Sequence, residues 1–261
     1  MPAALEDPPV KTTSLKLSGG KPAEWLIFVY SPASLFSLKA SWATSTAGKT
    51  LLTPTPYAVK MAFVDAALRC KLIADPDSFV RSLAKASLRI GLPRHACVTE
   101  TIQRVRQETH DSDRKQDPEL PPYRPNVAFR EMVHYQGELR FAFDRGTCSA
   151  DLTQTLQRVA PAINYVGKRG SFIQYMESVE QSGLDPSFTS PLNEDADPAL
   201  GHRASLDDFG PKASFDALNS FSTTGIRRGS DRIFIDTLVP LGIRNVGPGF
   251  THYSITRSAT L

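Results

Sequence analysis

The chain has 261 residues, 41% of them hydrophobic and 22% charged, and a formal net charge of +3. This composition is typical of a globular protein that buries its own core, and it excludes a disulfide-stapled miniprotein and a fully disordered chain. No apolar run reaches the ~18 residues of a membrane span. Residues 1–22, rich in Pro, Gly, Ser and Lys, predict a flexible leader without a secretory signal, so we expect a cytoplasmic protein.

The next part of the chain predicts a strand, a basic loop and a helix in that order. Residues 25–32 are apolar on both faces, as expected of a central strand. The stretch 37–50 is polar and basic and has the character of a loop. Thr55 then provides an N-cap and Pro56 a first helical residue, and apolar residues recur at helical spacing as far as Arg69.

A second helix is predicted over residues 76–90. Asp75 can cap it, and Gly91 and Pro93 can end it. Its basic residues would form one stripe, either a solvated surface or a phosphate contact. These residues are Arg81, Lys85 and Arg89.

Charge is distributed unevenly along the chain. Residues 81–115 hold eight bases and four acids, a balance of +4, whereas residues 185–216 hold seven acids and two bases, a balance of −5. This segregation favours a protein that presents one basic face.

The middle of the chain predicts two strand regions around a polar segment. Residues 95–106 are β-branched enough to form a strand. Residues 107–126 are polar and proline-rich, which predicts an exposed excursion that is either a mobile loop or an arm. Residues 127–144 alternate, and Gln136-Gly137 is a plausible tight turn, so a hairpin or a long bent strand is expected there.

A third helix and a further strand complete the first 180 residues. The helix is predicted over residues 151–165, capped by Asp151 and shortened or kinked by Pro161. Residues 172–180 follow as a strand.

The C-terminal part is harder to assign. Residues 181–224 are acidic and rich in Pro and Ser, which predicts a surface insertion or a linker. Residues 225–261 contain two late strands, at 231–239 and 250–255.

The element order of residues 23–180 indicates an α+β fold. The sequence of β-α-(α)-β-β-α-β is that of the ferredoxin-like or RRM-type fold, an antiparallel sheet with helices on one face. We expect the segment 107–126 to extend from this domain as an insertion and the C-terminal residues to add a β-rich extension. Because many functions share this fold, it does not by itself name one.

The stretch 43–50, ATSTAGKT, formally matches a relaxed P-loop. A true P-loop opens a helix whose N-terminal amides bind phosphate. Pro54 and Pro56 follow too closely for a regular helix to run on from Thr50. A nucleotide-binding P-loop protein is therefore retained only as an alternative, and the small polar residues with Lys49 are expected to contact nucleic-acid phosphates instead.

The histidines and cysteines give little sign of metal or redox chemistry. No two histidines lie at helical ligand spacing, and Cys70, Cys97 and Cys148 share no close spacing, so no metal site, disulfide framework or cofactor is expected. His134 beside Tyr135 is the one candidate pair for acid–base catalysis on an RNA 2′-hydroxyl. A lone strand histidine is more often structural.

A glycine-bracketed turn follows the third predicted helix. Gly167 and Gly170 flank Lys168 and Arg169, which allows backbone amides and two cations to approach an anion closely. The alternative is a plain helix-to-strand turn with two exposed charges. Residues 225–228 repeat the pattern more weakly, as a turn.

Five segments of the chain together resemble a known family. They are WLIFVYSP, SWATSTAGKT, LLTPTPYAVKMAFVDAAL, FREMVHYQGELRFAFD and INYVGKRGSF. Over residues 25–180 they are similar to the fifth family of CRISPR-associated (Cas) proteins, RAMP proteins that cap one end of Cascade-type effector complexes. The proline-led helix and the Tyr-x-Gly-Lys-Arg turn carry most of the resemblance.

The resemblance implies a subunit that binds the 5′ handle of the guide RNA (crRNA). It implies that Gly167–Gly170 touch the handle, and that the insertion at about 107–126 is a thumb that packs on a neighbouring backbone RAMP subunit and kinks the guide. Further partners would be the large effector subunit and, through the complex, target DNA. The basic residues on or near this thumb are Arg104, Arg106, Arg114 and Lys115.

Single-stranded RNA is held by cations along its phosphates and by aromatic rings against its bases. The loop 37–50 offers both kinds of residue, although its Trp is equally suited to a core position. Its candidate contacts are Lys39, Trp42, Thr44, Ser45, Thr46 and Lys49. We therefore expect a non-catalytic RNA-binding subunit that contributes to target interference. A metal-independent endoribonuclease that matures precursor crRNA is the first alternative.

Overall fold

The computed structural model describes residues 24–39, 47–192 and 200–256. The predicted leader therefore lies outside the described residues. The centre of the fold is a four-stranded antiparallel sheet with the strand order β3-β6-β1-β7. Its strands are β1 (Trp25–Pro32), β3 (Leu88–Gly91), β6 (Leu139–Asp144) and β7 (Ile173–Gln181). The fold is α+β and ferredoxin-like, as the sequence predicts.

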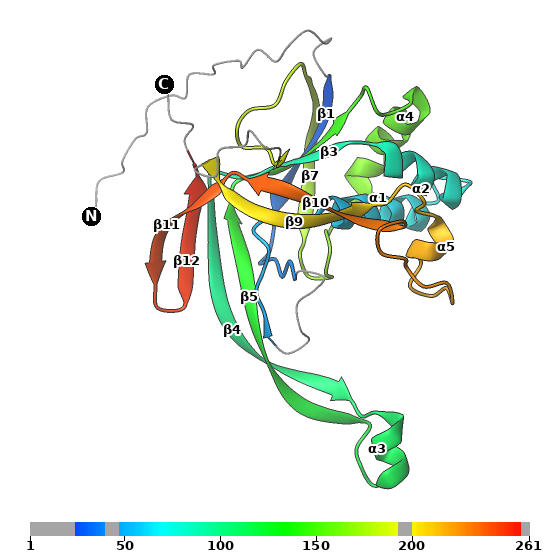
Figure 1. Cartoon of the computed structure of the whole chain (residues 1–261), viewed down its shortest axis with the longest axis vertical. Coiled ribbons are helices and arrows are strands. Elements are labelled where there is room, and N and C mark those ends of the chain that lie inside the picture. Colours follow the sequence, from blue (N-terminus) through cyan, green and yellow to red (C-terminus); the bar gives the residue numbers. More distant parts are fainter. Residues whose placement is uncertain (1–23, 40–46, 193–199, 257–261) are drawn as a thin grey trace.

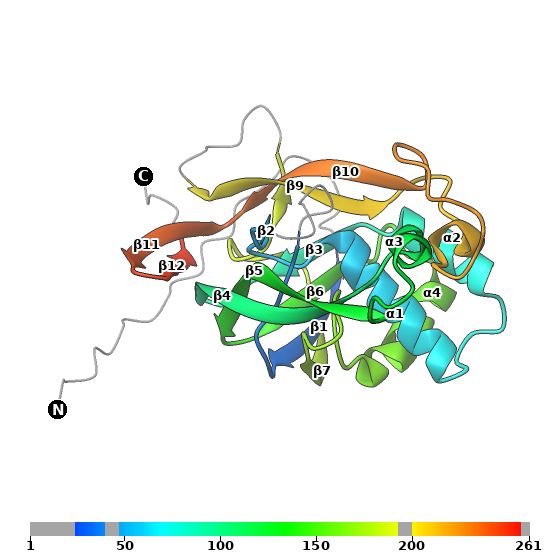
Figure 2. The same cartoon turned by 90° about the horizontal axis from the view of Figure 1, so that it is seen from below.

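Three helices cover one face of this sheet (Figures 1 and 2). They are α1 (Pro56–Arg69), α2 (Pro76–Lys85) and α4 (Ala150–Val159), the last continued by the short 3₁₀ helix η1 (Ala160–Ala162). Phe28 of β1 packs against Phe63 of α1 and Phe143 of β6, with ring centroids 5.5 and 6.1 Å apart. This aromatic cluster forms the centre of the main core.

The start of α1 is as predicted. The Thr55 hydroxyl accepts a hydrogen bond of 3.1 Å from the Ala58 amide, and Pro56 occupies the first turn. The expected cap of the third helix was wrong by two residues. Ser149, not Asp151, is its N-cap and accepts from the Leu152 amide at 3.1 Å, which places Asp151 in the first turn beside the helix dipole.

The predicted second helix is too long. It ends at Lys85, and Leu88–Gly91 leaves the helix to form β3, which pairs antiparallel with β6. Arg89 therefore sits in a strand, where burial lowers the pKa of its guanidinium, and it does not extend the basic stripe of Arg81 and Lys85. Pairing with a strand 50 residues further along outweighs the local helical spacing here.

This short strand changes the assignment of the sheet. β3 is the second strand of the ferredoxin-like unit, a place that the sequence pattern gave to residues 95–106. Those residues belong to β4 (His95–Glu108), which pairs with β5 (Tyr123–Gln136). Gln136-Gly137 does not close a hairpin, because β5 and β6 lie in different sheets. The segment forms neither a hairpin nor one long strand, but two strands that run on from one sheet into the next.

β4 and β5 form a long ribbon, called the arm here, that projects from the body of the molecule (Figure 1). Helix α3 (Asp111–Gln116) lies at its tip. The base of the arm belongs to a second sheet with the order β11-β12-β4-β5-β2. The other strands of that sheet are β2 (Ala47–Gly48), β11 (Leu241–Gly247) and β12 (Phe250–Ile255).

The expectation of an insertion or linker at 181–224 fails for its folded part. β9 (His202–Phe209) pairs with β10 (Arg232–Val239), and β8 (Ser190–Pro191) adds to β10. β9 packs on the side of α1 that faces away from the main sheet (Figure 2). The sequence did not indicate β9 as a strand because two acidic residues, Asp207 and Asp208, stand at buried positions. They are paired there with Arg232 and Lys60, which are far away in sequence.

An ion pair and a cation–π contact attach this third sheet to α1. Lys60 is fully buried and lies 2.8 Å from a carboxylate oxygen of Asp208, while Arg232 pairs with Asp207 and stacks 4.2 Å from the Tyr57 ring. Burial lowers the pKa of Lys60 and raises the pKa of Asp208, and each partner's charge opposes that shift. These groups are paired internally and are not exposed as a charged surface.

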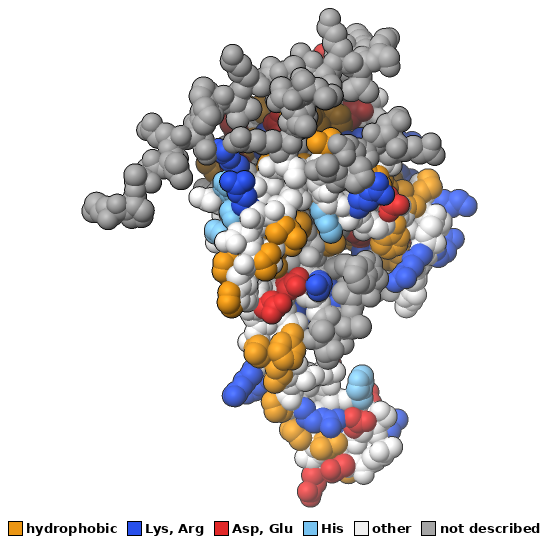
Figure 3. Space-filling model, turned by 60° about the vertical axis from the view of Figure 1, so that its left-hand side comes forward, with side chains coloured by type: hydrophobic (Ala, Val, Ile, Leu, Met, Phe, Trp, Pro, Cys, Tyr) orange, Lys and Arg blue, Asp and Glu red, His pale blue; other side chains and the backbone are white. Residues whose placement is uncertain are grey.

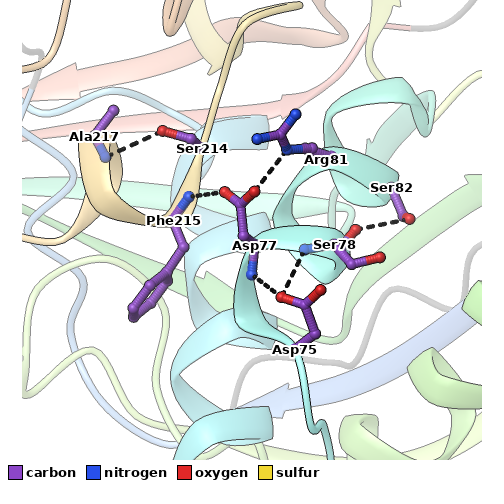
Figure 4. A network of polar contacts seen from close by, with 8 residues as sticks. All are labelled: Asp75, Asp77, Ser78, Arg81, Ser82, Ser214, Phe215 and Ala217. Atoms are coloured by element: carbon purple, nitrogen blue, oxygen red, sulfur yellow. Dashed lines mark hydrogen bonds and ion pairs between the residues drawn. The ribbon is translucent and has the colours of Figure 1, made fainter.

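A smaller network attaches helix α5 (Phe215–Leu218) to α2 (Figure 4). The Asp77 carboxylate accepts a hydrogen bond of 2.9 Å from the Phe215 amide and one of 2.7 Å from Arg81, and these contacts lower its pKa. Asp75 caps α2 by accepting from the Asp77 and Ser78 amides, as predicted.

Candidate nucleic-acid interface

The glycine-bracketed turn links η1 to β7 as a closed and well-defined structure. Gly167 and Gly170 have φ values of +72° and +103°, a region that residues with a side chain rarely adopt. The Ser171 amide donates to the Lys168 carbonyl at 3.1 Å, and the Val166 amide donates to the Ser171 carbonyl at 3.2 Å. The turn therefore holds Lys168 and Arg169 at its tip.

The turn is fixed to the segment that follows β1. The Ser34 hydroxyl donates to the Gly170 carbonyl at 2.6 Å and accepts from the Phe172 amide at 2.8 Å. The Ala33 amide adds a bond of 2.9 Å to the Phe172 carbonyl. On its other side, Gly167 lies close to Ala58 in the first turn of α1.

Both cations of this turn face solvent. Lys168 and Arg169 are exposed, and within the described part of the chain neither forms an ion pair. Two exposed cations held on a closed turn can approach an anion. Binding of an anion at Gly167–Gly170 stays a prediction.

A second group of cations gathers at the base of the arm. Lys39 pairs with Thr50 in an isolated antiparallel bridge, and the Thr50 amide donates to the Glu131 carboxylate at 2.8 Å. Lys39 therefore shares a face with Gly48 and Thr50, whereas Lys49 points to the opposite face. A Cβ added at Gly48 would lie 3.5 Å from a guanidinium nitrogen of Arg130 and 3.6 Å from Cγ of Lys39. Arg130 thus belongs to this group.

Sequence reasoning missed Arg130. The alternation of residues 127–136 could have indicated it, because alternation places Arg130 on the opposite face from Phe129. In the β2–β5 pairing, Arg130 lies opposite Gly48.

The described part of the P-loop match contradicts that alternative. Ala47–Gly48 forms β2, which pairs parallel with β5, and α1 starts only at Pro56. Residues 48–50 therefore run into an extended segment, and no helix opens there to present its N-terminal amides to a phosphate. Trp42, Thr44, Ser45 and Thr46 lie outside the described residues.

The arm carries its basic residues among apolar ones. Arg104 and Val127 lie opposite each other, beside the pair Ile102 and Phe129, which are 71% and 59% exposed. Arg106 follows on the same face. Figure 3 shows hydrophobic, basic and acidic side chains on the side of the arm turned toward the viewer.

The structure brings some candidate residues together and separates others. Ser34 at the glycine turn and Lys39 at the arm base are five residues apart, so at most about 18 Å of chain joins the two cation groups. Arg114 and Lys115 lie on α3 at the tip of the arm. Because β4 has 14 residues, the tip is about 45 Å from the base.

The candidate catalytic pair is split between surface and core. His134 is exposed on β5. Tyr135 is 3% exposed, its hydroxyl donates to the Leu52 carbonyl at 2.9 Å, and burial raises its pKa well above the usual value. From this position Tyr135 supports the core and does not reach a surface-bound substrate.

No group of three metal-ligating side chains forms a metal site within the described residues, and all three cysteines are free thiols. None of the described helices combines the length and hydropathy that crossing a membrane requires.

The outer face of the main sheet is partly covered by residues 182–192. Phe188 packs on Ile27, Val29 and Ala142, and the Arg140 guanidinium lies 4.6 Å from its ring centre. Arg140 also pairs with Asp185 at 3.0 Å. A strand of nucleic acid therefore cannot lie flat across β3, β6 and β1 on this face without displacing the segment.

No protein-family model matches the chain, and no curated protein sequence matches it. Among solved structures, it is similar to a CRISPR protein from Archaeoglobus fulgidus. The two share 10% identity over 90% of this chain and 93% of that one, with a TM-score of 0.43. A likeness at this level carries no weight for function.

Proposed function

We propose that the chain is a non-catalytic RNA-binding subunit of a CRISPR effector complex and that it holds the 5′ handle of the guide RNA. The proposal rests on one observation above all. Lys168 and Arg169 are exposed at the tip of a turn that hydrogen bonds and two glycines hold in place. The resemblance of residues 25–180 to the fifth Cas family supplies the biological setting.

The chemistry favours a single strand. The two cation groups are joined by the segment 33–39, so the backbone of a single-stranded RNA can follow this segment from the glycine turn to Lys39 and Arg130. An electropositive path of this kind recognises phosphates without regard to sequence. In the assembled effector the arm would contact the neighbouring backbone subunit, with the large subunit and target DNA bound through the complex.

The test removes both charges at the turn. Lys168→Ala with Arg169→Ala is expected to weaken binding to single-stranded guide RNA and to flatten the slope of log K against log salt by about 1.4, since each phosphate contact contributes about 0.7. Binding is measured by fluorescence anisotropy between 50 and 200 mM salt.

The control removes equal charge elsewhere. Arg203 and Lys212 are exposed on β9 and before α5, and Arg203→Ala with Lys212→Ala should leave the slope unchanged. An equal flattening of the slope in both double variants would mean that only the net charge of the protein determines binding. An unaltered slope in the turn variant would show that the turn is not part of the site.

The competing function is a metal-independent endoribonuclease, which the exposed His134 keeps open. Precursor RNA is incubated with the protein and a chelator. Specific cleavage that disappears in His134→Ala would establish the nuclease and overturn the non-catalytic assignment.

A further inference from the structure

Two aromatic residues flank the cationic turn and face the same side. Tyr165 and Phe172 form an isolated antiparallel bridge. The Val166 amide bonds the Ser171 carbonyl at 3.2 Å and the Ile173 amide bonds the Asn164 carbonyl at 3.0 Å. These bonds flank the bridge, so the two residues are a non-hydrogen-bonded pair whose side chains emerge close together.

Phe172 is exposed although its backbone is fixed. Its side chain is 51% exposed, whereas its neighbours Ser171 and Ile173 are 2% and 4% exposed. The amide and the carbonyl of Phe172 are bonded by Ser34 and Ala33. Its exposure therefore follows from strand alternation in a well-held segment, and the ring is presented in a defined place.

Resting on the function proposed above, we infer that Phe172 and Tyr165 form a stacking platform for one unpaired base. In a single strand each base is tied to the phosphate next to it, so a ring beside Lys168 and Arg169 can contact the base whose phosphate those cations hold. Stacking accepts any base because every base has a π face. The platform thus adds affinity for single-stranded nucleic acid without selecting a sequence.

A protein partner fits this surface less well. The accessible apolar side chains at the turn are the exposed Phe172 and Leu35 and the half-buried Tyr165. A fully buried aromatic side chain covers about 150–250 Å², so three such groups fall short of the about 800 Å² per partner of a stable interface. Two flanking cations on so small a patch favour a nucleotide.

The experiment pairs a truncation with a missing base. Wild type and Phe172→Ala are titrated with uridine-rich single-stranded RNA and with the same RNA carrying an abasic site at each position in turn. We expect Phe172→Ala to weaken binding of the intact RNA about 5- to 150-fold. At one abasic position the two proteins should bind equally, because the base that stacks is gone.

The matched control is Phe221→Ala, which truncates a ring that is 95% exposed beyond α5. It should leave affinity unchanged. Phe172→Trp should restore affinity and add a tryptophan signal that RNA quenches. Equal affinities of wild type and Phe172→Ala for intact RNA, or a loss that persists at every abasic position, would overturn the platform.

These outcomes separate the platform from the proposed function. If Lys168→Ala with Arg169→Ala weakens binding while Phe172→Ala does not, the turn binds phosphate and the platform is wrong. If neither the double variant nor Phe172→Ala changes RNA binding, both the proposed function and the platform are wrong. Parallel titrations with single-stranded DNA show whether the site prefers RNA, since stacking alone does not distinguish the two.

Discussion

The cations of this protein divide into two regions with opposite uses. Around α1 and β9, Lys60 and Arg232 are buried or half-buried against Asp208 and Asp207. At the glycine turn, Lys168 and Arg169 face solvent and form no ion pair within the described chain. Both regions are rich in charge, yet the first stabilises the fold and only the second is available to a ligand. A formal net charge of +3 therefore says little about where a polyanion binds.

The acidic residues of the segment 185–216 are likewise used in internal ion pairs. Residues 185–216 carry an excess of acids, but Asp185 pairs with Arg140, Asp207 with Arg232 and Asp208 with Lys60. These carboxylates neutralise cations of the folded domain. Fewer exposed bases remain than the sequence suggests, and among the described residues they include Lys168 and Arg169 at the turn and Arg104 and Arg106 on the arm.

The largest expected effect comes from breaking the buried pair. Asp208→Leu leaves the Lys60 ammonium buried without its counter-charge, and we expect a loss of about 3–5 kcal/mol in the free energy of unfolding. Lys60→Met combined with Asp208→Leu should cost less than the single change, because no uncompensated charge remains. Urea unfolding measures both.

The matched control for that pair lies on the same helix. Asp65 and Arg69 of α1 form an exposed pair of 3.5 Å, and Asp65→Ala should cost no more than about 1 kcal/mol. A double variant less stable than Asp208→Leu alone would show that the buried pair is not the dominant attachment of β9.

The second-largest expected effect tests the backbone conformation of the glycine turn that holds Lys168 and Arg169. Gly170 has a φ of +103° and open space around it, so Gly170→Ala should lose about 1–2 kcal/mol through backbone strain alone. Gly183 also has open space but no such φ, and Gly183→Ala should be neutral or slightly stabilising. Equal stability of the two variants by urea unfolding would refute the strained turn.

The smallest effect concerns pH at the segment that covers the main sheet. Burial raises the pKa of Asp185, but hydrogen bonds from Ser187 and Arg140 outweigh it and leave the pKa below its ordinary value. A depressed carboxylate stabilises the fold above its unfolded pKa of about 4, and this contribution disappears as pH falls through the folded value. Asp185→Asn should therefore be less stable than wild type at pH 7, and the difference should shrink as pH falls below about 4. Urea unfolding at several pH values measures this, and a constant difference would contradict it.

Local signals explain what the sequence could predict. β1 and α1 were predictable because an apolar run, a cap and a proline act within a few residues. β3 was not, since its four residues become a strand only by pairing with β6. β9 was hidden because its acidic residues are matched by Lys60 and Arg232, which lie far away in the chain.

The candidate site divides in the same way. Gly167 and Gly170 predict a turn, and the structure has a turn there in which both glycines have positive φ values. The aromatic ring of Phe172 and the guanidinium of Arg130 gain their places only through Ser34 and through the β2–β5 pairing. No spacing rule within one segment contains that information.

The arm joins the central sheet through two very short connections. β3 ends at Gly91 and β4 begins at His95, while β5 ends at Gln136 and β6 begins at Leu139. At this junction Gly137 is packed against Pro93 so tightly that an added Cβ would lie 3.2 Å from its ring. These short connections attach the base of the arm directly to β3 and β6, so a partner bound at α3 would be joined through one continuous ribbon to the central sheet.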